Sequence, residues 1–335
     1  MRGKRREPEI APITAATHDG RGIARTDGKT VFVAGALEGE TVRFVRRKRR
    51  RNFDEAELLE VIEPSSERVD PGCAVYGRCG GCSLQHVSVG AQRKIKEQAL
   101  RDSLERIGGV SPSTWLPPLT GQEWQYRRRA RLAVKDVAAK GRALVGFRER
   151  HAPFITDMQR CEVLAAPVDA LIAPLSDLIS SLSIRARLPQ IEVAVADNAV
   201  ALVFRVLDPP DEQDLEAIRA FAVEHEVRVY LQSRGPDSIV PLEPAASPPL
   251  FYAMPEFDLR MAFEPADFVQ VNGEINQRMV GTAVELLDIE STHRVLDLFC
   301  GIGNFSLPIA RRAGEVIGIE GEALLVGRAS ANALN

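Results

Sequence analysis

Residues 295–310 read Val-Leu-Asp-Leu-Phe-Cys-Gly-Ile-Gly-Asn-Phe-Ser-Leu-Pro-Ile-Ala, and this stretch decides the expected fold of the C-terminal part. Its apolar start predicts a buried strand, Gly301 and Gly303 predict a tight turn, and residues 304–310 predict the start of a helix. The first amides of that helix would face the turn, where the glycines let the backbone approach a ligand closely. The stretch therefore predicts a strand, turn and helix that bind a nucleotide-like molecule.

A second strand and an acidic residue follow this unit. Val316–Ile319 predicts the strand, and Glu320 comes directly after it. In a parallel α/β sheet, an acidic residue at this place binds ribose hydroxyls. Position 306 is Ser, so the third glycine of the dinucleotide fingerprint is missing, which counts against NAD and FAD. Asp297, the Gly-x-Gly turn and Glu320 suit S-adenosylmethionine better. The alternative is an ordinary strand-turn-helix unit without a ligand.

Length, composition and charge bound the class of protein. The chain has 335 residues, of which 45% are hydrophobic and 27% charged, and this size favours two or three domains. It has no run of 18 apolar residues and no signal segment, so we expect a cytoplasmic protein without a membrane span. Residues 1–51 carry 14 Lys and Arg against 6 acidic residues, about +8, which leaves about −11 for the remainder. This asymmetry predicts a polyanionic partner at one end.

The N-terminal residues predict a basic tail followed by a small β-barrel. Residues 1–10 are expected to form the tail. From Ile13 to Pro64, short apolar runs alternate with glycine-containing turns, as in barrels of the OB type. The basic run Arg46–Arg51 lies on or beside a strand end. It is either a solvated loop of like charge or a phosphate-binding surface, and phosphate contacts would make the affinity depend on salt.

Three of the five cysteines are clustered in the sequence, the last two of them at CxxC spacing: Cys73, Cys79 and Cys82. Glycines between them permit the turns that would let the thiols converge on one metal centre. A fourth ligand is needed, and Cys161 is the only cysteine left besides Cys300. The spacing alone leaves zinc and iron–sulfur open, and unligated structural cysteines are the alternative. His86 is more typical of a hydrogen-bonding neighbour than of a ligand.

The middle of the chain predicts mixed helices and strands. Gln92–Ile107 has apolar residues on one helical face and ends at two glycines. Tyr126–Val134 predicts a strand with three arginines on one face, namely Arg127, Arg129 and Arg131. These arginines form either an exposed face of a sheet or a track for phosphates. Ile191–Val195 and Ala199–Phe204 predict a hairpin across Asp197-Asn198.

Four motifs, in a consistent order along the chain, carry a resemblance to a known family: Cys73 to His86, Cys161–Leu164, Phe268–Asn272 and Asp297–Pro308. On these motifs the sequence resembles the bacterial RNA uracil-5-methyltransferases, most closely the 23S ribosomal RNA type with an N-terminal TRAM barrel and a 4Fe-4S cluster. The resemblance implies four cluster ligands, which are Cys73, Cys79, Cys82 and Cys161. It also implies four contacts to S-adenosylmethionine, which are Gln270, Phe299, Asn304 and Glu320.

The implied fold class is a multi-domain α/β protein in three parts. Residues 1–66 would form the basic tail and the OB-like TRAM β-barrel that binds RNA. Residues 67–84 and 117–254 would form a central α+β domain with the iron–sulfur cluster. Residues 85–116 and 255–335 would form the start of a Rossmann-like methyltransferase domain. This last domain is expected to be incomplete.

The implied reaction transfers a methyl group from S-adenosylmethionine to C5 of a specific uridine in 23S rRNA. Because C5 of uracil is a poor nucleophile, a thiolate adds to C6 first, and a base later removes the C5 proton. Cys300 is not expected to supply that thiolate, since it lies in the cofactor turn at a non-catalytic position of the family. The nucleophilic cysteine and the base are expected beyond Asn335. The chain is therefore expected to be C-terminally truncated and inactive, with no catalytic residue of its own.

Three alternatives compete with this function. The first is a non-catalytic RNA-binding module made of the barrel and the cluster. The second is a tRNA uracil-5-methyltransferase, although these enzymes lack the barrel and the cysteine cluster. The third is a cluster-based radical enzyme, which would carry three cysteines at CxxxCxxC spacing and an open iron site. No membrane and no obligate protein partner is expected in any of these cases.

Overall fold

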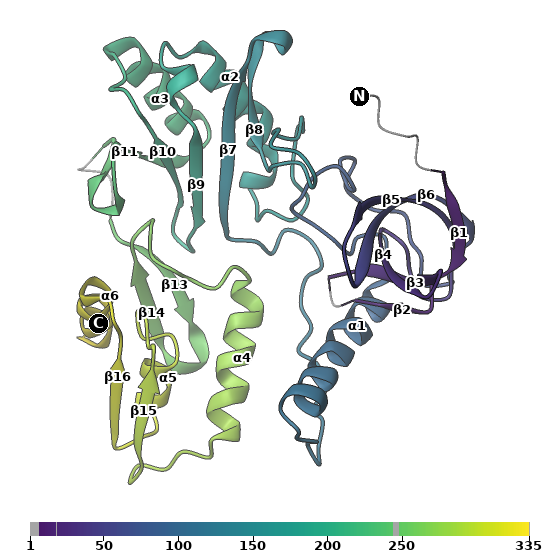
Figure 1. Ribbon diagram of the computed structural model, residues 1–335. Helices are drawn as coiled ribbons and strands as arrows, with labels where there is room; N and C mark the ends of the chain where they lie inside the picture. The colour runs from purple at the N-terminus through teal and green to yellow at the C-terminus, as the bar shows by residue number, and fades with distance from the viewer. Residues whose placement is uncertain (1–6, 18, 244–247, 335) are drawn as a thin grey trace. The chain divides into compact units, whose positions relative to one another are not determined.

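The computed structural model describes residues 7–17, 19–243 and 248–334, and its internal contacts divide the chain into two compact units (Figure 1). Unit 1 comprises Met1–Pro118 and Glu149–Ala152, and unit 2 comprises Leu119–Arg148 and Pro153–Asn335. Most of the predicted basic tail lies outside the described residues, as does Asn335. The division into three parts stays a prediction.

Unit 1 is built on a six-stranded sheet that curls round on itself as a barrel (Figure 1). The strand order is β1-β5-β6-β4-β3-β2, and only the β4–β6 pair is parallel. The strands are β1 (Glu9–Pro12), β2 (Ala15–Ala16), β3 (Arg21–Thr26), β4 (Lys29–Ala34), β5 (Thr41–Arg49) and β6 (Phe53–Glu63). Alternate apolar residues, among them Val31, Val42 and Phe44, are fully buried inside it. The barrel predicted from the alternating pattern is confirmed, and it includes the last two residues of the expected tail.

One helix completes the regular structure described for unit 1. Helix α1 (Val89–Asp102) begins at Ser88, whose hydroxyl accepts a hydrogen bond from the backbone N–H of Ala91 at 3.2 Å. A π-helical turn, Ser103–Ile107, follows instead of the regular helix predicted to the same point. On the predicted apolar face, Leu100 and Ile107 are exposed. The helix is therefore confirmed, but half of that face does not contribute to the core.

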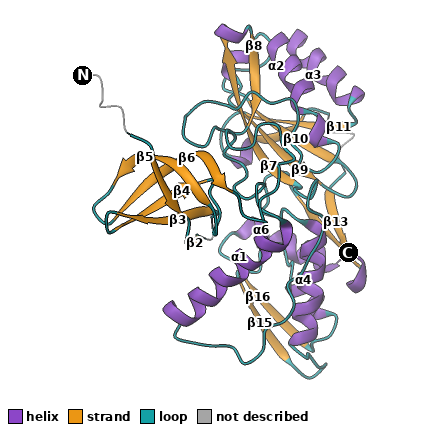
Figure 2. Ribbon diagram, turned by 90° about the vertical axis from the view of Figure 1, so that its right-hand side faces the viewer, coloured by secondary structure: helices purple, strands orange, loops and turns teal. Residues whose placement is uncertain are grey.

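Unit 2 begins with a six-stranded sheet in the order β12-β11-β10-β9-β7-β8, in which only β10 and β11 are parallel. The strands are β7 (Arg129–Val137), β8 (Arg142–Gly146), β9 (Gln190–Val195), β10 (Val200–Arg205), β11 (Val227–Gln232) and β12 (Ile239–Pro241). Helices α2 (Ile172–Ser181) and α3 (Glu212–Glu224) pack against β8 and β11 (Figure 2). The register pairs Val195 with Val200, which confirms the predicted hairpin.

The remainder of unit 2 carries the motif with which the sequence analysis began. Its elements are β13 (Leu250–Met254), β14 (Leu259–Phe263), α4 (Gly273–Leu286), β15 (Arg294–Leu298), α5 (Ser306–Ala310), β16 (Glu315–Ile319) and α6 (Ala323–Leu334). Strands β15 and β16 are parallel, and β13 and β14 form an antiparallel hairpin. This hairpin spans the boundary expected between residues 254 and 255. Among the described residues, no helix has both the length and the apolar character needed to cross a membrane.

One continuous core joins these elements to the central sheet of unit 2. It includes buried residues of the central sheet, the hairpin, α4, α5 and the turn before α5: Ala201, Val203, Tyr230, Leu250, Phe263, Val280, Val284, Ile302 and Ile309. By contrast, one face of the β15–β16 pair is open to solvent. Leu296, Leu298, Ile317 and Ile319 are between 45% and 56% exposed there. The core therefore supports one side of the cofactor motif only.

Candidate functional site

The turn between β15 and α5 has a sharply bent backbone. Phe299, Gly301 and Gly303 have φ angles of 62°, 56° and 93°. The Cys300 N–H donates to the carbonyl of Ile319 at 3.0 Å, which ties the turn to the end of β16. Left-handed backbone at a residue other than glycine is uncommon and often marks a functional site. Here it presents the Phe299 side chain, 87% exposed, at the rim of the turn.

Glu320 lies just past β16 and folds back on the same turn. Its Oε2 accepts the N–H of Gly301 at 3.0 Å, and its Oε1 accepts the N–H of Gly321 at 2.6 Å. These backbone hydrogen bonds, that from Gly301 above all, lower the pKa of Glu320. A carboxylate is therefore held in its ionised form at the carboxyl edge of a parallel sheet, where such sheets bind ribose.

Asn304 is held by two polar partners from other elements. It exchanges amide hydrogen bonds of 2.9 and 3.0 Å with Asn276 of α4, and its Oδ1 also accepts the Tyr252 hydroxyl at 2.9 Å. Burial raises the pKa of Tyr252, so its hydroxyl stays a donor. The turn is thus anchored to α4 and to β13. The loop before α4 carries Gln270, which is exposed.

Asn332 is a structural residue of the site that the sequence analysis missed. Its side chain is 2% exposed. It bonds the backbone N–H and carbonyl of Ala262 at 2.8 and 3.0 Å, and it donates to the carbonyl of Ile302 at 3.3 Å. Helix α6 is thereby fastened to β14 and to the cofactor turn at one point. Asn332 lies 30 residues after Ile302 in the sequence, and no local sequence pattern predicts its contact with the turn.

Cys300 and Asp297 have roles within the motif. The Ser306 hydroxyl donates to Asp297 Oδ2 at 2.6 Å, which joins the strand tip to the start of α5. The Cys300 thiol is buried and packs against Gly318, where an added Cβ would lie 2.8 Å from Sγ. Burial, with the nearby carboxylates of Asp297 and Glu320, raises the pKa of Cys300. Such a thiol is poorly suited to nucleophilic attack, because the thiolate is the reactive form.

Two family models match this chain. The TRAM domain model matches residues 3–44, and the tRNA (Uracil-5-)-methyltransferase model matches residues 156–333, more than half of the chain. The chain belongs to the tRNA (uracil-5-)-methyltransferase family. Motif order, cofactor turn and TRAM barrel all agree with the membership expected from the sequence.

Several relatives of this protein share one name, 23S rRNA (uracil(1939)-C(5))-methyltransferase RlmD. The protein of Nitrosococcus oceani is 51% identical over 98% of this chain and 73% of its own length. That of Thiobacillus denitrificans is 47% identical over 97% of this chain and 75% of its own length. The fold also matches the crystal structure of Pyrococcus abyssi tRNA (uracil-54, C5)-methyltransferase in complex with S-adenosyl-L-homocysteine. That match has a TM-score of 0.71 at 20% identity and covers 97% of this chain and 76% of that chain.

The expectation that the methyltransferase domain is only the incomplete start of a Rossmann-like fold is wrong. The family model runs through residues 156–333, and 97% of the chain matches the Pyrococcus abyssi structure. The expectation treated β15, β16 and their helices as the beginning of a separately folded sheet. Instead, Val280, Ile302 and Ile309 share one core with the central sheet of unit 2. The expectation of an inactive chain rested on the same reasoning, and these matches give it no support.

Three of the predicted cluster cysteines lie on one loop of unit 1: Cys73, Cys79 and Cys82. The Gly81 N–H donates to the Cys79 sulfur at 3.4 Å, and the Arg150 side chain donates to the carbonyl of Cys82 at 2.5 Å. His86 hydrogen-bonds the Tyr76 hydroxyl at 2.6 Å, as expected of a neighbour. Cys161 belongs to unit 2. Within the part of the chain that the structure describes, no three His, Cys, Asp or Glu side chains converge closely enough to hold a metal ion.

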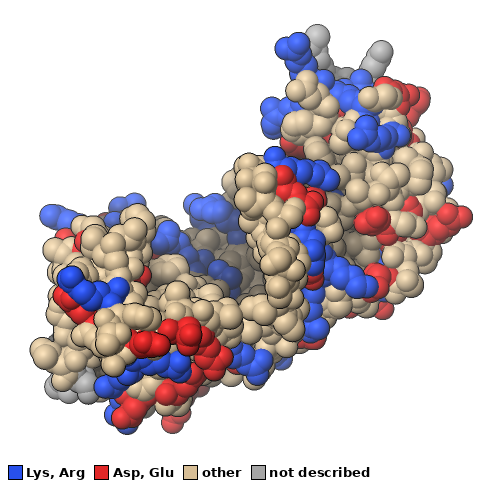
Figure 3. All heavy atoms as spheres, turned by 90° about the horizontal axis from the view of Figure 1, so that it is seen from below, with Lys and Arg blue, Asp and Glu red and all other residues tan. Residues whose placement is uncertain are grey.

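The basic run at the end of β5 divides into one buried residue and an exposed remainder. Arg46 is 6% exposed and bonds Glu9 and Asp54, at 2.7 Å in each case. Burial would raise the pKa of Asp54, but hydrogen bonds from Lys29 and Arg46 outweigh it and lower that pKa to about 2. Residues 47–51 are exposed. On the face of the molecule that Figure 3 shows, Lys and Arg side chains lie among Asp and Glu side chains. As a phosphate contact, Arg46 is therefore excluded by its burial, whereas its exposed neighbours stay candidates.

The three arginines predicted on one strand face have separate environments. Arg129 is half-buried and donates to the carbonyl of Pro265, and burial lowers its pKa. Arg131 is 69% exposed in its side chain and pairs with Glu192 at 3.0 Å. Arg127 precedes β7, and its Nε is buried with no hydrogen-bond partner among the described residues. The three therefore do not form one continuous exposed track.

Proposed function

We propose that this protein methylates C5 of a specific uridine in 23S rRNA, with S-adenosylmethionine as the methyl donor. The observation that carries the proposal is the cofactor turn, in which Glu320 is held by the Gly301 amide at the edge of a parallel pair of strands. Membership of the family and the names of relatives at 47–51% identity support the choice of reaction and of RNA. We place this activity in the cytoplasm, with the ribosomal RNA.

S-adenosylmethionine would supply an electrophilic methyl group, and four residues are proposed to hold it. Glu320 would accept hydrogen bonds from the ribose hydroxyls, which its ionised state favours. Phe299, exposed and next to the bent backbone of the turn, would pack on the adenine ring. Asn304 and Gln270 would offer their amides from the turn and from the loop before α4. The anchoring of Asn304 by Asn276 supports a preformed site.

The methyl acceptor needs a separate activation. Attack of a thiolate at C6 of uracil makes C5 nucleophilic, and a base then removes the C5 proton. We propose that none of the five cysteines of this chain supplies that thiolate. Four are assigned to the cluster, and the buried Cys300 thiol has a raised pKa. The base likewise is not assigned to a residue of this chain.

A 4Fe-4S cluster bound by Cys73, Cys79, Cys82 and Cys161 is part of the proposal. The donor set of four thiols and the N–H···S bond from Gly81 to Cys79 suit thiolate ligands. Since no three ligands converge within the described residues, the support comes from residue type and from the family resemblance. Iron and sulfide analysis of anaerobically purified protein tests it. About four iron atoms in the wild type, and loss of the visible absorption in Cys79→Ser, are expected; a protein without iron would refute it.

Deletion of the gene in its own organism tests the reaction and its substrate together. The 23S rRNA and the tRNA are purified separately and digested to nucleosides, and 5-methyluridine is measured by mass spectrometry. We expect one 5-methyluridine to disappear from 23S rRNA and to return when the gene is supplied on a plasmid. If 23S rRNA keeps all its 5-methyluridine, the proposal fails. Loss from tRNA instead would identify the protein as a tRNA methyltransferase.

A further inference from the structure

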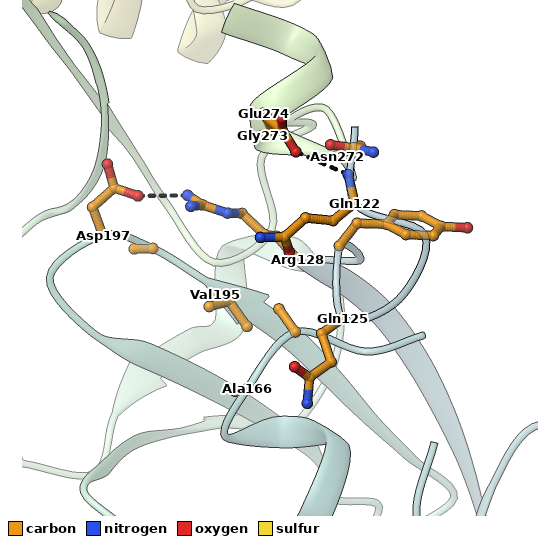
Figure 4. Close-up of a pocket in the computed structure, with 12 residues that line it drawn as sticks. Gln122, Gln125, Arg128, Ala166, Val195, Asp197, Asn272, Gly273 and Glu274 are labelled. Carbon is orange, nitrogen blue, oxygen red and sulfur yellow. Dashed lines mark hydrogen bonds and ion pairs between the residues drawn. The ribbon is translucent and has the colours of Figure 1, made fainter. Parts of the chain in front are cut away.

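Unit 2 contains a polar cavity that the proposed cofactor site does not use. Its volume is about 580 Å³. It is lined by three carboxamide side chains, an aromatic ring and two ion-paired groups, with smaller residues between them: Gln122, Gln125, Asn272, Tyr126, Arg128 and Asp197 (Figure 4). We propose that this cavity receives an unstacked base of the RNA, next to the uridine that is methylated. The inference rests on the proposed function and names one part of its substrate site.

The cavity is preformed, because backbone hydrogen bonds join its walls. The Arg128 N–H donates to the carbonyl of Val271 at 2.8 Å, and the Val195 N–H donates to the carbonyl of Arg128 at 2.8 Å. Gly273 lets the Arg128 side chain cross the start of α4, since a Cβ there would lie 2.9 Å from Nε. Gln125 has a φ of 54°, an uncommon angle for its type. Strained backbone kept in a rigid wall is a feature of ligand sites.

The charged groups of the cavity compensate one another, so its ligand is expected to be neutral. Arg128 pairs with Asp197 at 2.5 Å, as the dashed line in Figure 4 shows. Glu274 accepts the Gln122 N–H at 3.0 Å and pairs with Arg278 at 3.1 Å. A phosphate would have to compete with these carboxylates for the arginines. A base has no charge to compensate and suits the cavity better.

The uncharged polar groups match the edge of a base. The Gln125 amide nitrogen donates to Asp169 at 3.1 Å, which leaves its oxygen, and Asn272 Oδ1 accepts the Ile275 N–H at 3.1 Å, which leaves its nitrogen. Among the described residues, the Gln122 backbone N–H donates to Glu274, and its side chain forms no hydrogen bond. Carboxamides present a donor and an acceptor side by side, as base edges do. The Tyr126 ring adds a surface on which a base can stack.

The position of the cavity links it to the methyl donor. Asn272 lies two residues after Gln270, a proposed cofactor contact. Asn276, one turn further along α4, holds Asn304 of the cofactor turn at 2.9 Å. A base in the cavity would therefore belong to a nucleotide close to the reacting uridine. Unstacked bases of this kind are what proteins read in single-stranded RNA loops.

Binding of a synthetic 23S rRNA loop that contains U1939, the position given in the name of the relatives, and its flanking nucleotides tests the inference. We expect Tyr126→Ala to weaken binding by about tenfold, within the range for a lost stacking contact, and Tyr126→Phe to keep wild-type affinity. Gln122→Ala, at an exposed residue, should weaken binding about threefold. Trp124→Ala is the matched control, because Trp124 is an exposed aromatic residue of the same segment that does not line the cavity. Titration of S-adenosylmethionine checks that each variant is folded.

A scan of the same RNA with one base removed at a time identifies the nucleotide. At one position beside U1939, removal of the base should weaken the wild type by about tenfold and Tyr126→Ala no further. Equal losses in both proteins at every position would overturn the inference, as would wild-type affinity in both Tyr126→Ala and Gln122→Ala. If the wild type binds this loop no better than a shuffled sequence, both the inference and the proposed RNA substrate are wrong. If the wild type prefers this loop to a shuffled sequence but the cavity variants bind it as tightly as the wild type, the inference is wrong and the proposed substrate stands.

Discussion

Replacement of Arg46 by Ala is expected to destabilise the barrel by about 3 kcal/mol. Removal of one partner of a buried ion pair costs about 3–5 kcal/mol, because the other charge stays buried. Arg46 donates to Glu9 and Asp54 at 2.7 Å, and Asp54 is only 1% exposed. Lys29 stays 2.6 Å from Asp54 and compensates part of its charge, so the lower end of the range applies.

The loss of stability is measured by urea unfolding. Hydrogen exchange and mass spectrometry of peptides from residues 9–63 report the unfolding of the barrel. With a slope of about 2 kcal/mol per molar urea, we expect the midpoint of Arg46→Ala to fall by about 1.5 M. Arg47→Ala is the control, because Arg47 is 63% exposed in its side chain and its pair with Glu57 is worth under about 1 kcal/mol. An unchanged midpoint, together with RNA binding that is weaker and less sensitive to salt, would show that Arg46 contacts phosphate instead.

Four further outcomes are expected from the structure. Glu320→Gln should weaken S-adenosylmethionine binding about tenfold in calorimetry, since a charged acceptor is lost, whereas Glu322→Gln should leave it unchanged. In the deletion strain, Cys300→Ser should restore as much 5-methyluridine to the rRNA as the wild-type gene does; if the wild-type gene restores it and a folded Cys300→Ser protein does not, Cys300 would be the nucleophile. Asn332→Leu should lower the free energy of unfolding by about 3 kcal/mol, about 1 kcal/mol for each of its three lost hydrogen bonds, and a clearly smaller loss would contradict its anchoring role. The lowered pKa of Asp54 stabilises the barrel above pH 4. Acid-unfolding curves should show a loss of about 2 kcal/mol of this stabilisation as the pH falls from 4 to 2. Asp54→Asn should lack this loss.

The cofactor motif could be predicted because its signals are local. Strand, turn and acidic residue occupy 26 consecutive positions, and the parallel register brings Leu298 beside Ile319, so Glu320 meets the turn. The alternation of strand residues also places Arg46 on the same inner face as Val42 and Phe44, so its burial could have been predicted. The basic residues around it suggested an exposed surface instead. Asn332 and the polar cavity could not be predicted, because their partners come from segments far apart in the chain. The cysteine ligands stay a prediction for the same reason.

The exposed face of the β15–β16 pair determines how this chain behaves at high concentration. Four aliphatic side chains on neighbouring parallel strands form an exposed apolar surface, which water solvates poorly. Such a surface is covered in most parallel sheets. The chain should therefore bind a hydrophobic dye in its folded state and self-associate as its concentration rises. The exposed face of the β15–β16 pair should therefore affect the solubility of the purified protein before any effect on its activity is measured.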